Sequence, residues 1–394
     1  MKTKRALVML LAAIMMIGGF ASVFAGGQQE GQAAAETEEV YKIGIMPFHT
    51  GCFWFDPFTA GGAWYLMERG YDVVIENAEW NTQKMNTILR QWANDDEMDG
   101  VIIAPLGGEE VLPGIRALKE AGKTVVLSNN DAGYCPEADF CVRFNSPGEC
   151  AKGAEYVVEL LKEKYGEVKG TVILGLGDVR NSEHLERAGA VRDVFQQYPG
   201  IEIKEYVSNM DAGKAVTEVG TLLRTLSQVD ALFSVGMLEF MGHINALERE
   251  NMLYPIGDPN HVINVGMDSC PDVINPAVKK GYVDLVIDQP VLSYNAIAAY
   301  YLIKLLDAGG DTSVLPKPGT ELKAGDIDIY SKVPQDDLDI TIPADFWSPA
   351  KVIDTTKQYG HIWIQTNGSS VREENVDNPA LWSNITGQVK NFGW

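Results

Sequence analysis

The residues best suited to bind a small ligand are aromatic rings and planar polar groups that follow short apolar runs. The stretch "MPFHTGCFWFDPF" (residues 46–58) holds six rings, counting that of His49, together with two prolines and a glycine. It is too interrupted for a regular helix and too aromatic for an ordinary surface loop. Its rings Phe53, Trp54 and Phe55 offer flat apolar faces on which a ring-shaped ligand can stack.

Polar side chains follow the later apolar runs in a similar way. The residues in these positions are, in chain order, Asn129, Asn130, Arg187, Met237, Asp268 and Gln289. Carboxylate, amide and guanidinium groups form paired hydrogen bonds with neighbouring hydroxyl groups. Together with the aromatic faces, they suit a small polyhydroxylated ligand held in a largely apolar cleft.

Each of these residues also has a purely structural role open to it. The aromatic residues and Met237 would then pack in the core. The structural alternatives for the polar residues are a surface ion pair for Arg187, a helix N-cap for Asp268, the end of a strand for Gln289, and turns with local backbone bonds for Asn129 and Asn130. Ligands of open parallel sheets bind outside the carboxyl ends of the strands. We favour binding for Arg187, Asp268 and Gln289, and we leave Phe53, Asn129, Asn130 and Met237 open. Stacking is favoured for Trp54 and Phe55, because three rings in a loop with glycine and proline are hard to bury together.

The elements that would position these residues repeat regularly from residue 41. The near-continuous apolar runs "VIIA" (101–104) and "TVVL" (124–127) suit a parallel sheet covered on both faces. Strands that alternate with amphipathic helices predict a doubly wound α/β fold, and the pattern starts again near residue 146. After residue 311 it weakens. There, Trp347, Trp363, Trp382 and Trp394 either brace the second half or reach the cleft.

The N-terminus has the features of a signal peptide over residues 1–25. Three basic residues precede an apolar run that ends at Phe20, and small residues suit cleavage near Ala25. A membrane anchor is the alternative, although the run is short for a span; a lipid anchor would need a cysteine at the cleavage point, and the first is Cys52. Removing three basic residues changes the formal charge from −22 to −25, which argues against nucleic acid and anionic membranes as partners. We therefore expect a periplasmic protein.

Cysteines and sequence motifs give little sign of redox, metal or catalytic chemistry. Five cysteines are an odd set for an exported chain, and a disulfide between Cys135 and Cys141 is as compatible with the sequence as two free thiols. The sequence has no CxxC pair, and no histidine lies near Cys135 and Cys141 along the chain, so we predict no metal site and no cofactor. The fragment "GLGDVR" (175–180) lacks the third glycine of a dinucleotide loop, no phosphate-binding loop or GxSxG motif is present, and nothing sets two carboxylates apart as a glycosidase pair. We do not expect an enzyme.

From about residue 41 to about residue 310, the order of segments resembles the type I periplasmic sugar-binding proteins, the ribose- and galactose-binding group of ABC importers. The segments that carry the resemblance are "RGYD" (69–72), "DGVIIAP" (99–105), "SEHLERAGAV" (182–191), "VGMDSCPD" (265–272) and "GYVDLVIDQ" (281–289). The resemblance implies that Arg187, Asp268 and Gln289 contact a sugar. It also implies that "GCFWF" (51–55) stands in place of the family's aromatic loop.

Four positions depart from the ribose-type pattern. Cys52 replaces an asparagine, Asn129 and Asn130 replace an Asp–Arg pair, and Gly236, followed by Met237, replaces another asparagine. Ribose itself is therefore not expected. A polyol or a furanosyl signal is the alternative ligand, and a sensor module that presents its bound state to a membrane receptor is the alternative role.

The resemblance further implies two lobes joined by three crossovers, near residues 145, 289 and 315. The expected parts are a linker (26–40), a first lobe (41–145 with about 290–314), a second lobe (146–289 with about 315–345) and a C-terminal extension (346–394). It implies a monomer that clamps a small sugar between its lobes and delivers it to an ABC permease in the inner membrane.

Overall fold

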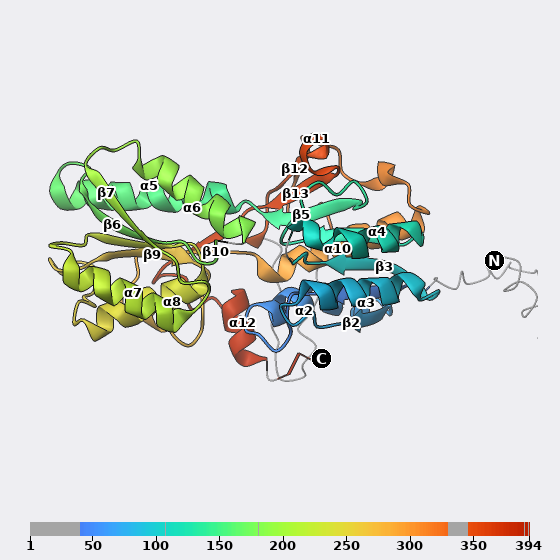
Figure 1. The fold of residues 1–394 in the computed structure, drawn as a ribbon, viewed down its shortest axis with the longest axis horizontal. Coiled ribbons are helices and arrows are strands. Elements are labelled where there is room, and N and C mark those ends of the chain that lie inside the picture. Colours follow the sequence, from blue (N-terminus) through green and yellow to red (C-terminus); the bar gives the residue numbers. More distant parts are fainter. Residues whose placement is uncertain (1–39, 107, 180, 330–345, 390, 393) are drawn as a thin grey trace, which may run out of the picture. The chain divides into compact units, whose positions relative to one another are not determined.

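The structure, a computed structural model, describes residues 40–106, 108–179, 181–329, 346–389, 391, 392 and 394. The predicted signal peptide and the predicted linker up to residue 39 lie outside the described residues, as do residues 330–345. In the described part, the chain forms two β-sheets, each flanked by helices (Figure 1). This confirms the predicted α/β fold with two doubly wound halves.

The first sheet has eight strands in the order β11-β12-β13-β5-β4-β3-β1-β2. Its strands are β1 (Lys42–Met46), β2 (Asp72–Ile75), β3 (Met98–Ile103), β4 (Thr124–Ser128), β5 (Phe140–Phe144), β11 (Glu321–Leu322), β12 (Ala350–Ile353) and β13 (Ile362–Thr366). The strands from β2 to β13 pair in parallel, and β12 and β11 complete the edge antiparallel.

The second sheet has six strands in the order β14-β10-β9-β8-β6-β7. Its strands are β6 (Gly170–Gly175), β7 (Ile201–Tyr206), β8 (Ala231–Ser234), β9 (Ile263–Met267), β10 (Leu285–Asp288) and β14 (Ser369–Val371). All pair in parallel except β14, which is antiparallel to β10. Both sheets therefore have a parallel centre and an antiparallel edge.

Helices cover both faces of each sheet (Figure 1). They are α2 (Phe55–Glu68), α3 (Thr82–Asn94), α4 (Leu112–Glu120), α5 (Ser146–Tyr165), α6 (Ser182–Phe195), α7 (Ala212–Thr225), α8 (Met237–Arg249), α9 (Ile274–Lys279), α10 (Val291–Asp307), α11 (Thr356–Tyr359) and α12 (Trp382–Gln388), with the short 3-10 helices η1 (Gly108–Val111) and η2 (Thr312–Val314). Helix α2 packs against α10 and α3 against α4, whereas α5 packs against α6 and α7 against α8. Asn81 is the N-cap of α3, because its side chain accepts the Lys84 N–H at 2.9 Å.

Two glycines let α2 and α10 approach closely. A Cβ atom on Gly61 would overlap the backbone carbonyl of Leu292, and one on Gly62 would lie 2.8 Å from Cβ of Asn295. The amide of Asn295 donates to the carbonyl oxygen of Phe58 at 2.9 Å, which ties the two helices together. Any larger residue at these positions would force the helices apart.

Helix α2 begins earlier than the sequence suggested. The aromatic stretch looked too interrupted for a helix, but α2 starts at Phe55 with Trp54 as its N-cap residue. Pro57 lies in the first turn, where its missing N–H is not needed, so it does not break the helix. The rings at 53–55 are therefore at a helix start rather than in an open loop.

The C-terminal part completes both sheets. Strands β11, β12 and β13 extend the first sheet, and β14 extends the second. Residues 315–345 were expected in the second lobe, but residues 321–322, which form β11, lie in the first sheet. Among the described residues, the chain passes between the sheets at Asn145, at Gln289–Pro290 and at Asn367–Gly368. The third crossing is thus not near residue 315, as predicted, because the chain returns through β12 and β13 before it leaves the first sheet.

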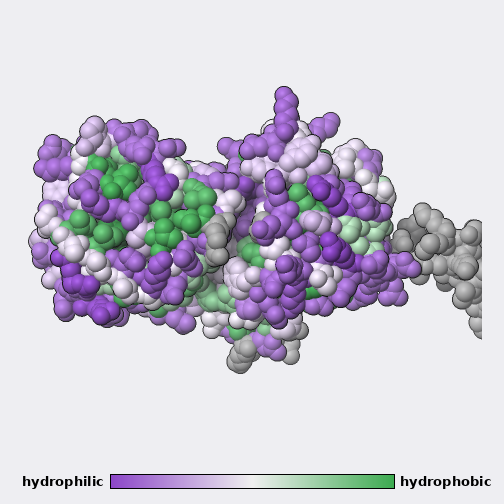
Figure 2. Space-filling view, viewed as in Figure 1, coloured by the Kyte–Doolittle hydropathy of each residue, from purple (hydrophilic) through white to green (hydrophobic). Residues whose placement is uncertain are grey.

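Charged and polar side chains dominate the face drawn in Figure 2, where hydrophobic residues form small separate groups.

All five cysteines belong to the described residues, and all are free, so the structure contains no bond between Cys135 and Cys141. Both of these thiols are buried. Burial raises the pKa of the Cys135 thiol to about 12, which keeps it protonated.

Candidate ligand-binding site

Asp268 and Gln289 are joined at the carboxyl end of the second sheet. Asp268 follows β9 in a left-handed conformation (φ 69°), and its N–H donates to the carbonyl oxygen of Ile287 on β10. The Gln289 amide donates to Oδ1 of Asp268 at 2.6 Å, and the Tyr294 hydroxyl donates to Oε1 of Gln289 at 2.9 Å. This chain of hydrogen bonds fixes the orientation of the carboxylate. Burial raises the pKa of Asp268, while Arg187 and Gln289 oppose the rise.

Arg187 lies on the buried side of α6. Its Nε donates to Oγ of Ser146 at 3.1 Å, and its Nη1 donates to the carbonyl oxygen of Val235 at 2.9 Å. Burial opposes its charge, but Glu183 and Asp268 hold the Arg187 pKa above its ordinary range. The arginine is thus a fixed cation beside Asp268, with its fork positioned by two separate elements.

Trp54 brings an aromatic face from the first half of the chain to this polar group. Its ring stacks on Phe58, with centroids 5.4 Å apart, and its side chain is half-buried. The indole N–H is buried without a well-formed hydrogen bond, yet it lies near enough to Asp268 to lower the pKa of that carboxyl. The structure therefore brings together Trp54, Arg187, Asp268 and Gln289.

The two neighbouring rings have different surroundings. Phe55 is 6% exposed and packs against Phe48 and Trp80, with centroids 5.0 and 5.3 Å away. It belongs to the core beneath the helix start. Phe53 instead packs on Trp382 of α12, with centroids 5.1 Å apart. The C-terminal part thus contacts the aromatic stretch directly.

The remaining predicted residues do not join this group through hydrogen bonds in the described part of the chain. The Asn129 amide donates to Oδ1 of Asn130 at 3.0 Å, and the Asn129 N–H donates to the carbonyl oxygen of Val142 on β5. Asn129 also has a left-handed backbone (φ 69°), as asparagine tolerates in turns. Met237 is the first residue of α8 and is half-buried against apolar residues that include Phe240.

Arg143 is a functional candidate that the sequence reasoning missed. It projects from β5, is 3% exposed, and donates from Nη2 to Glu183 and to Oε2 of Glu186 (2.9 Å). Burial opposes its charge, but the two glutamates hold the Arg143 pKa above its ordinary range. An arginine within the apolar run "FCVRFN" (140–145) was the available signal, because a charge in a central parallel strand needs a buried partner.

Two further carboxyl groups at the strand ends of the second sheet have strongly raised pKa values. Burial raises the pKa of Glu239 to about 7 even though it accepts a hydrogen bond from Ser208. Burial likewise raises the pKa of Asp288 to about 7, and Oδ1 of Asp288 accepts from the Trp382 indole at 2.8 Å. Such perturbed groups often mark functional sites, because burial that serves ligand binding also disfavours charge.

The fold and these strand-end groups agree with a match to a known family. A family model described as "Periplasmic binding protein domain" covers residues 43–311. The chain belongs to this family. The resemblance to type I periplasmic sugar-binding proteins is thereby confirmed, and the match covers both parallel sheet centres.

Solved structures of solute-binding and sugar-binding proteins share the fold. A substrate-binding protein of a sugar ABC transport system from Bordetella parapertussis is 14% identical, with a TM-score of 0.65 over 91% of this chain and 96% of its own. A solute-binding protein from Bacillus halodurans with bound myo-inositol is 14% identical, with a TM-score of 0.62 over 87% and 98%. A glucose-galactose binding protein from Geobacillus stearothermophilus is 19% identical, with a TM-score of 0.58 over 71% and 100%.

The comparison with curated proteins found no match. Among the described residues of this periplasmic binding protein, no helix is both long enough and apolar enough to cross a membrane.

Proposed function

We propose that this chain is an exported solute-binding protein that captures a small sugar between its two lobes and delivers it to an ABC importer in the inner membrane. The observation that carries the proposal is the convergence of Trp54, Arg187, Asp268 and Gln289. A stacking face from the first lobe meets a fixed carboxylate, amide and guanidinium from the second. The family membership supports the same role.

The chemistry of this group suits neighbouring hydroxyls. Oδ1 of Asp268 already accepts from Gln289, which leaves the other carboxylate oxygen free to accept from a sugar hydroxyl. Arg187 donates to the oxygen of the next hydroxyl, and the Trp54 face packs against the C–H side of the sugar ring. The buried indole N–H of Trp54 supplies one more donor. Phe53, Asn129, Asn130 and Met237 remain proposed contacts at the edge of this site.

Ligand capture would work through a hinge at the three crossings. These segments lie side by side, because the Asn145 N–H donates to the carbonyl oxygen of Thr366 at 3.0 Å and a Cβ on Gly368 would meet the carbonyl oxygen of Asp288. Ligand contacts to both lobes favour the closed arrangement, and the permease then binds that arrangement. No step of this role requires catalysis, a cofactor or an oligomer.

A polyol ligand is the second candidate, and the residues around Gly236 favour it. The family's asparagine is absent there, and a Cβ on Gly236 would lie 2.7 Å from Oε2 of Glu239. A carboxyl group with a pKa near 7 thus lies where an amide would otherwise be. A carboxyl group accepts hydrogen bonds from hydroxyl groups and needs no ring oxygen in the ligand. A cyclic or open polyol offers hydroxyl groups alone.

A thermal-shift screen of the mature protein against sugars, polyols and amino acids tests both candidates. A true ligand at one hundred times its Kd adds about 2.7 kcal/mol, which raises Tm by roughly 5–10 °C for a protein of this size. A sugar that raises Tm supports the first candidate, and a polyol that acts alone supports the second. A response confined to amino acids would overturn both while leaving the fold intact.

The hinge needs a separate measurement. Small-angle scattering with and without the identified ligand should show a more compact bound protein. Equal scattering profiles at saturation would exclude ligand-driven closure. An uptake assay distinguishes transport from a sensor role. If the protein serves transport, membrane vesicles that contain the cognate permease and its ATPase should take up ligand only when the protein is present.

A further inference from the structure

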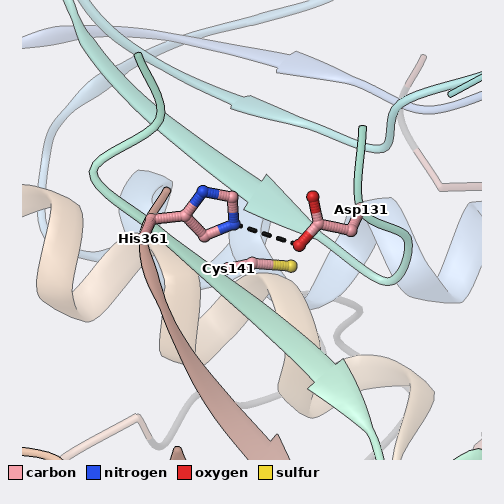
Figure 3. Close-up of side chains that lie close together, drawn as sticks. All are labelled: Asp131, Cys141 and His361. Carbon is pink, nitrogen blue, oxygen red and sulfur yellow. Dashed lines mark hydrogen bonds and ion pairs between the residues drawn. The ribbon is translucent and has the colours of Figure 1, made fainter. Parts of the chain in front are cut away.

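Three side chains with metal-binding atoms converge on the first sheet, directly beside Asn130. Asp131 follows β4, Cys141 lies on β5, and His361 immediately precedes β13. Since β5 lies between β4 and β13 in the sheet, the three side chains meet across neighbouring strands. One ligand atom from each residue lies within 4.8 Å of the others, and Figure 3 shows the His361 ring and the Asp131 carboxylate directed toward each other beside the Cys141 sulfur.

The group is buried, and one of its polar atoms has no partner. The side chains of His361 and Asp131 are 1% and 5% exposed, and Cys141 is fully buried. Oδ2 of Asp131 lies 3.0 Å from Nε2 of His361 and accepts from the Trp363 indole at 2.6 Å. Oδ1 of Asp131 has no hydrogen-bond partner. A buried carboxylate oxygen without a partner is costly unless a cation or proton satisfies it.

The surroundings of His361 hold its ring with Nε2 toward the other two ligand atoms. Its Nδ1 lies 2.9 Å from the carbonyl oxygen of Cys135, which can only accept, so Nδ1 carries a hydrogen. Nε2 lies 3.0 Å from Oδ2 of Asp131, so a hydrogen joins these two atoms in the metal-free protein, and a metal ion would have to displace it to reach the Nε2 lone pair. Metal-binding histidines commonly donate their other ring N–H to a backbone carbonyl in this way.

We propose that Asp131, Cys141 and His361 form a Zn²⁺ site. The ligand atoms are a carboxylate oxygen, Sγ and Nε2, the mixed oxygen, sulfur and nitrogen set that Zn²⁺ accepts and that Ca²⁺ and Mg²⁺ do not. Zinc at about 2.0–2.3 Å from each ligand places neighbouring ligand atoms roughly 3.3–3.6 Å apart. The His361–Asp131 contact therefore widens slightly and the sulfur moves inward. Metal binding releases to solvent the thiol proton of Cys141 and the hydrogen that joins Nε2 of His361 to Oδ2 of Asp131, and the two anionic ligands then balance the charge of the ion.

A second His–Asp pair in the same chain shows what the thiol adds. His261 lies 2.7 Å from the carbonyl oxygen of Tyr254 through Nδ1 and 3.0 Å from Oδ2 of Asp284 through Nε2. This geometry matches that of His361. Among the described residues, however, no third histidine, cysteine, aspartate or glutamate brings a ligand atom close to both His261 and Asp284. A buried His–Asp pair alone is thus an ordinary structural contact, and the Cys141 sulfur distinguishes the proposed site.

One positive charge lies near the site but is already balanced. Arg143 packs over the Trp363 ring at 4.3 Å, and its attraction lowers the pKa of Cys141 against the rise that burial causes. Its guanidinium is paired with Glu183 and Glu186, so the net charge it adds beside the metal is small. Because Asp131 directly follows Asn130, a bound ion would brace the turn that carries Asn129 and Asn130. The site itself does not depend on the proposed sugar binding.

Zinc titration of the tag-free, reduced mature protein tests the proposal without any transport assay. In competition with a colorimetric zinc chelator, the wild type should bind one Zn²⁺ per chain. Co²⁺ in its place should give a thiolate-to-cobalt charge-transfer band in the near ultraviolet. A folded, reduced wild type that takes no Zn²⁺ from the chelator, or that binds Co²⁺ without this band, would overturn the proposal.

Matched variants separate this site from other histidines and thiols. Cys141→Ser and His361→Asn should each weaken Zn²⁺ binding by more than about 100-fold, the upper range for loss of supporting residues alone. His261→Asn removes the other His–Asp pair and should leave the one-to-one stoichiometry unchanged. Circular dichroism confirms folding, and if Cys141→Ser fails to fold, the thiolate-to-cobalt band of the wild type still reports on its thiol. Equal zinc affinity in Cys141→Ser, or lost affinity in His261→Asn, would contradict the assignment.

Discussion

The guanidinium group of Arg143, on β5 of the first sheet, donates a hydrogen bond to the buried carboxylate of Glu183, on α6 beside the second sheet. The same Nη2 reaches Oε2 of Glu186 at 2.9 Å. Glu183 also lies 3.7 Å from Arg187, the proposed sugar contact. A single carboxylate thus connects an arginine of one lobe with the arginine proposed to bind ligand in the other.

Replacing Arg143 should strongly destabilise the protein. Arg143→Met leaves Glu183 buried without its main partner, and breaking a buried ion pair costs about 3–5 kcal/mol. The free energy of unfolding from urea denaturation measures this loss. Adding Glu183→Gln to Arg143→Met should restore part of it, because the buried charge is then removed.

The control for this prediction is an exposed ion pair. Arg116 lies 2.9 Å from Glu137 and is 52% exposed. Arg116→Met should cost at most about 1 kcal/mol, as exposed pairs do. Equal losses for Arg116→Met and Arg143→Met would show that the Arg143 pair contributes no more than a surface contact.

Trp54 and Phe55 should respond differently to truncation, although they are adjacent. Trp54→Ala should weaken sugar binding by about 1–3 kcal/mol, as loss of stacking does for other flat ligands. Phe55→Ala should lower the free energy of unfolding by about 3–5 kcal/mol, because it leaves a cavity in the core. Calorimetric titration and urea denaturation of both variants separate the two effects. A folded Trp54→Ala protein with unchanged affinity would place Trp54 outside the site.

The sequence predicted the fold where its pattern was local. The parallel strands β1 to β10 are short apolar runs separated by helices, so each could be recognised without knowing its partner. Strands β12 and β13 are different. Strand β13 pairs with β5, some two hundred residues earlier in the chain, and β12 pairs with β13 in a stretch without helical spacing. No local period marks such strands, so the C-terminal part was not assigned.

The candidate site was predictable to the same extent. The rule that ligands lie at the carboxyl ends of parallel strands selected Asp268 and Gln289, which the structure joins by a hydrogen bond. It did not separate Trp54 from the buried Phe55, because burial depends on how the helix start packs. The zinc ligands gave no signal, since His361 lies far along the chain from Cys141 and metal-site motifs rely on close spacing.

The close contact between α2 and α10 predicts a sharp difference between two helical glycines. Gly61→Ala should lower the free energy of unfolding by about 1–3 kcal/mol or more, because the added methyl group overlaps Leu292. Gly189 on α6 is the matched control, since nothing lies within 4 Å of a Cβ placed there. Gly189→Ala should raise stability by about 0.5–1 kcal/mol. Stabilisation by both substitutions would mean that α2 and α10 are not in tight contact.

Glu239 should make the protein less stable as the pH rises. Its pKa is raised from an ordinary value of 4.5 to about 7 in the folded state, chiefly by burial. Between these values the folded state holds the proton and the unfolded state has released it. Rising pH therefore favours unfolding, so the contribution is complete below about pH 4 and is lost as the pH passes 7.

The difference between the wild type and Glu239→Gln isolates this contribution from those of other groups, including Asp288. Urea denaturation from pH 4.5 to pH 8 should show the wild type losing about 2–3 kcal/mol relative to Glu239→Gln. Glu159→Gln, at an exposed position on α5, should instead follow the wild type across the range. Parallel curves for the wild type and Glu239→Gln would show that Glu239 does not hold a proton in the folded state.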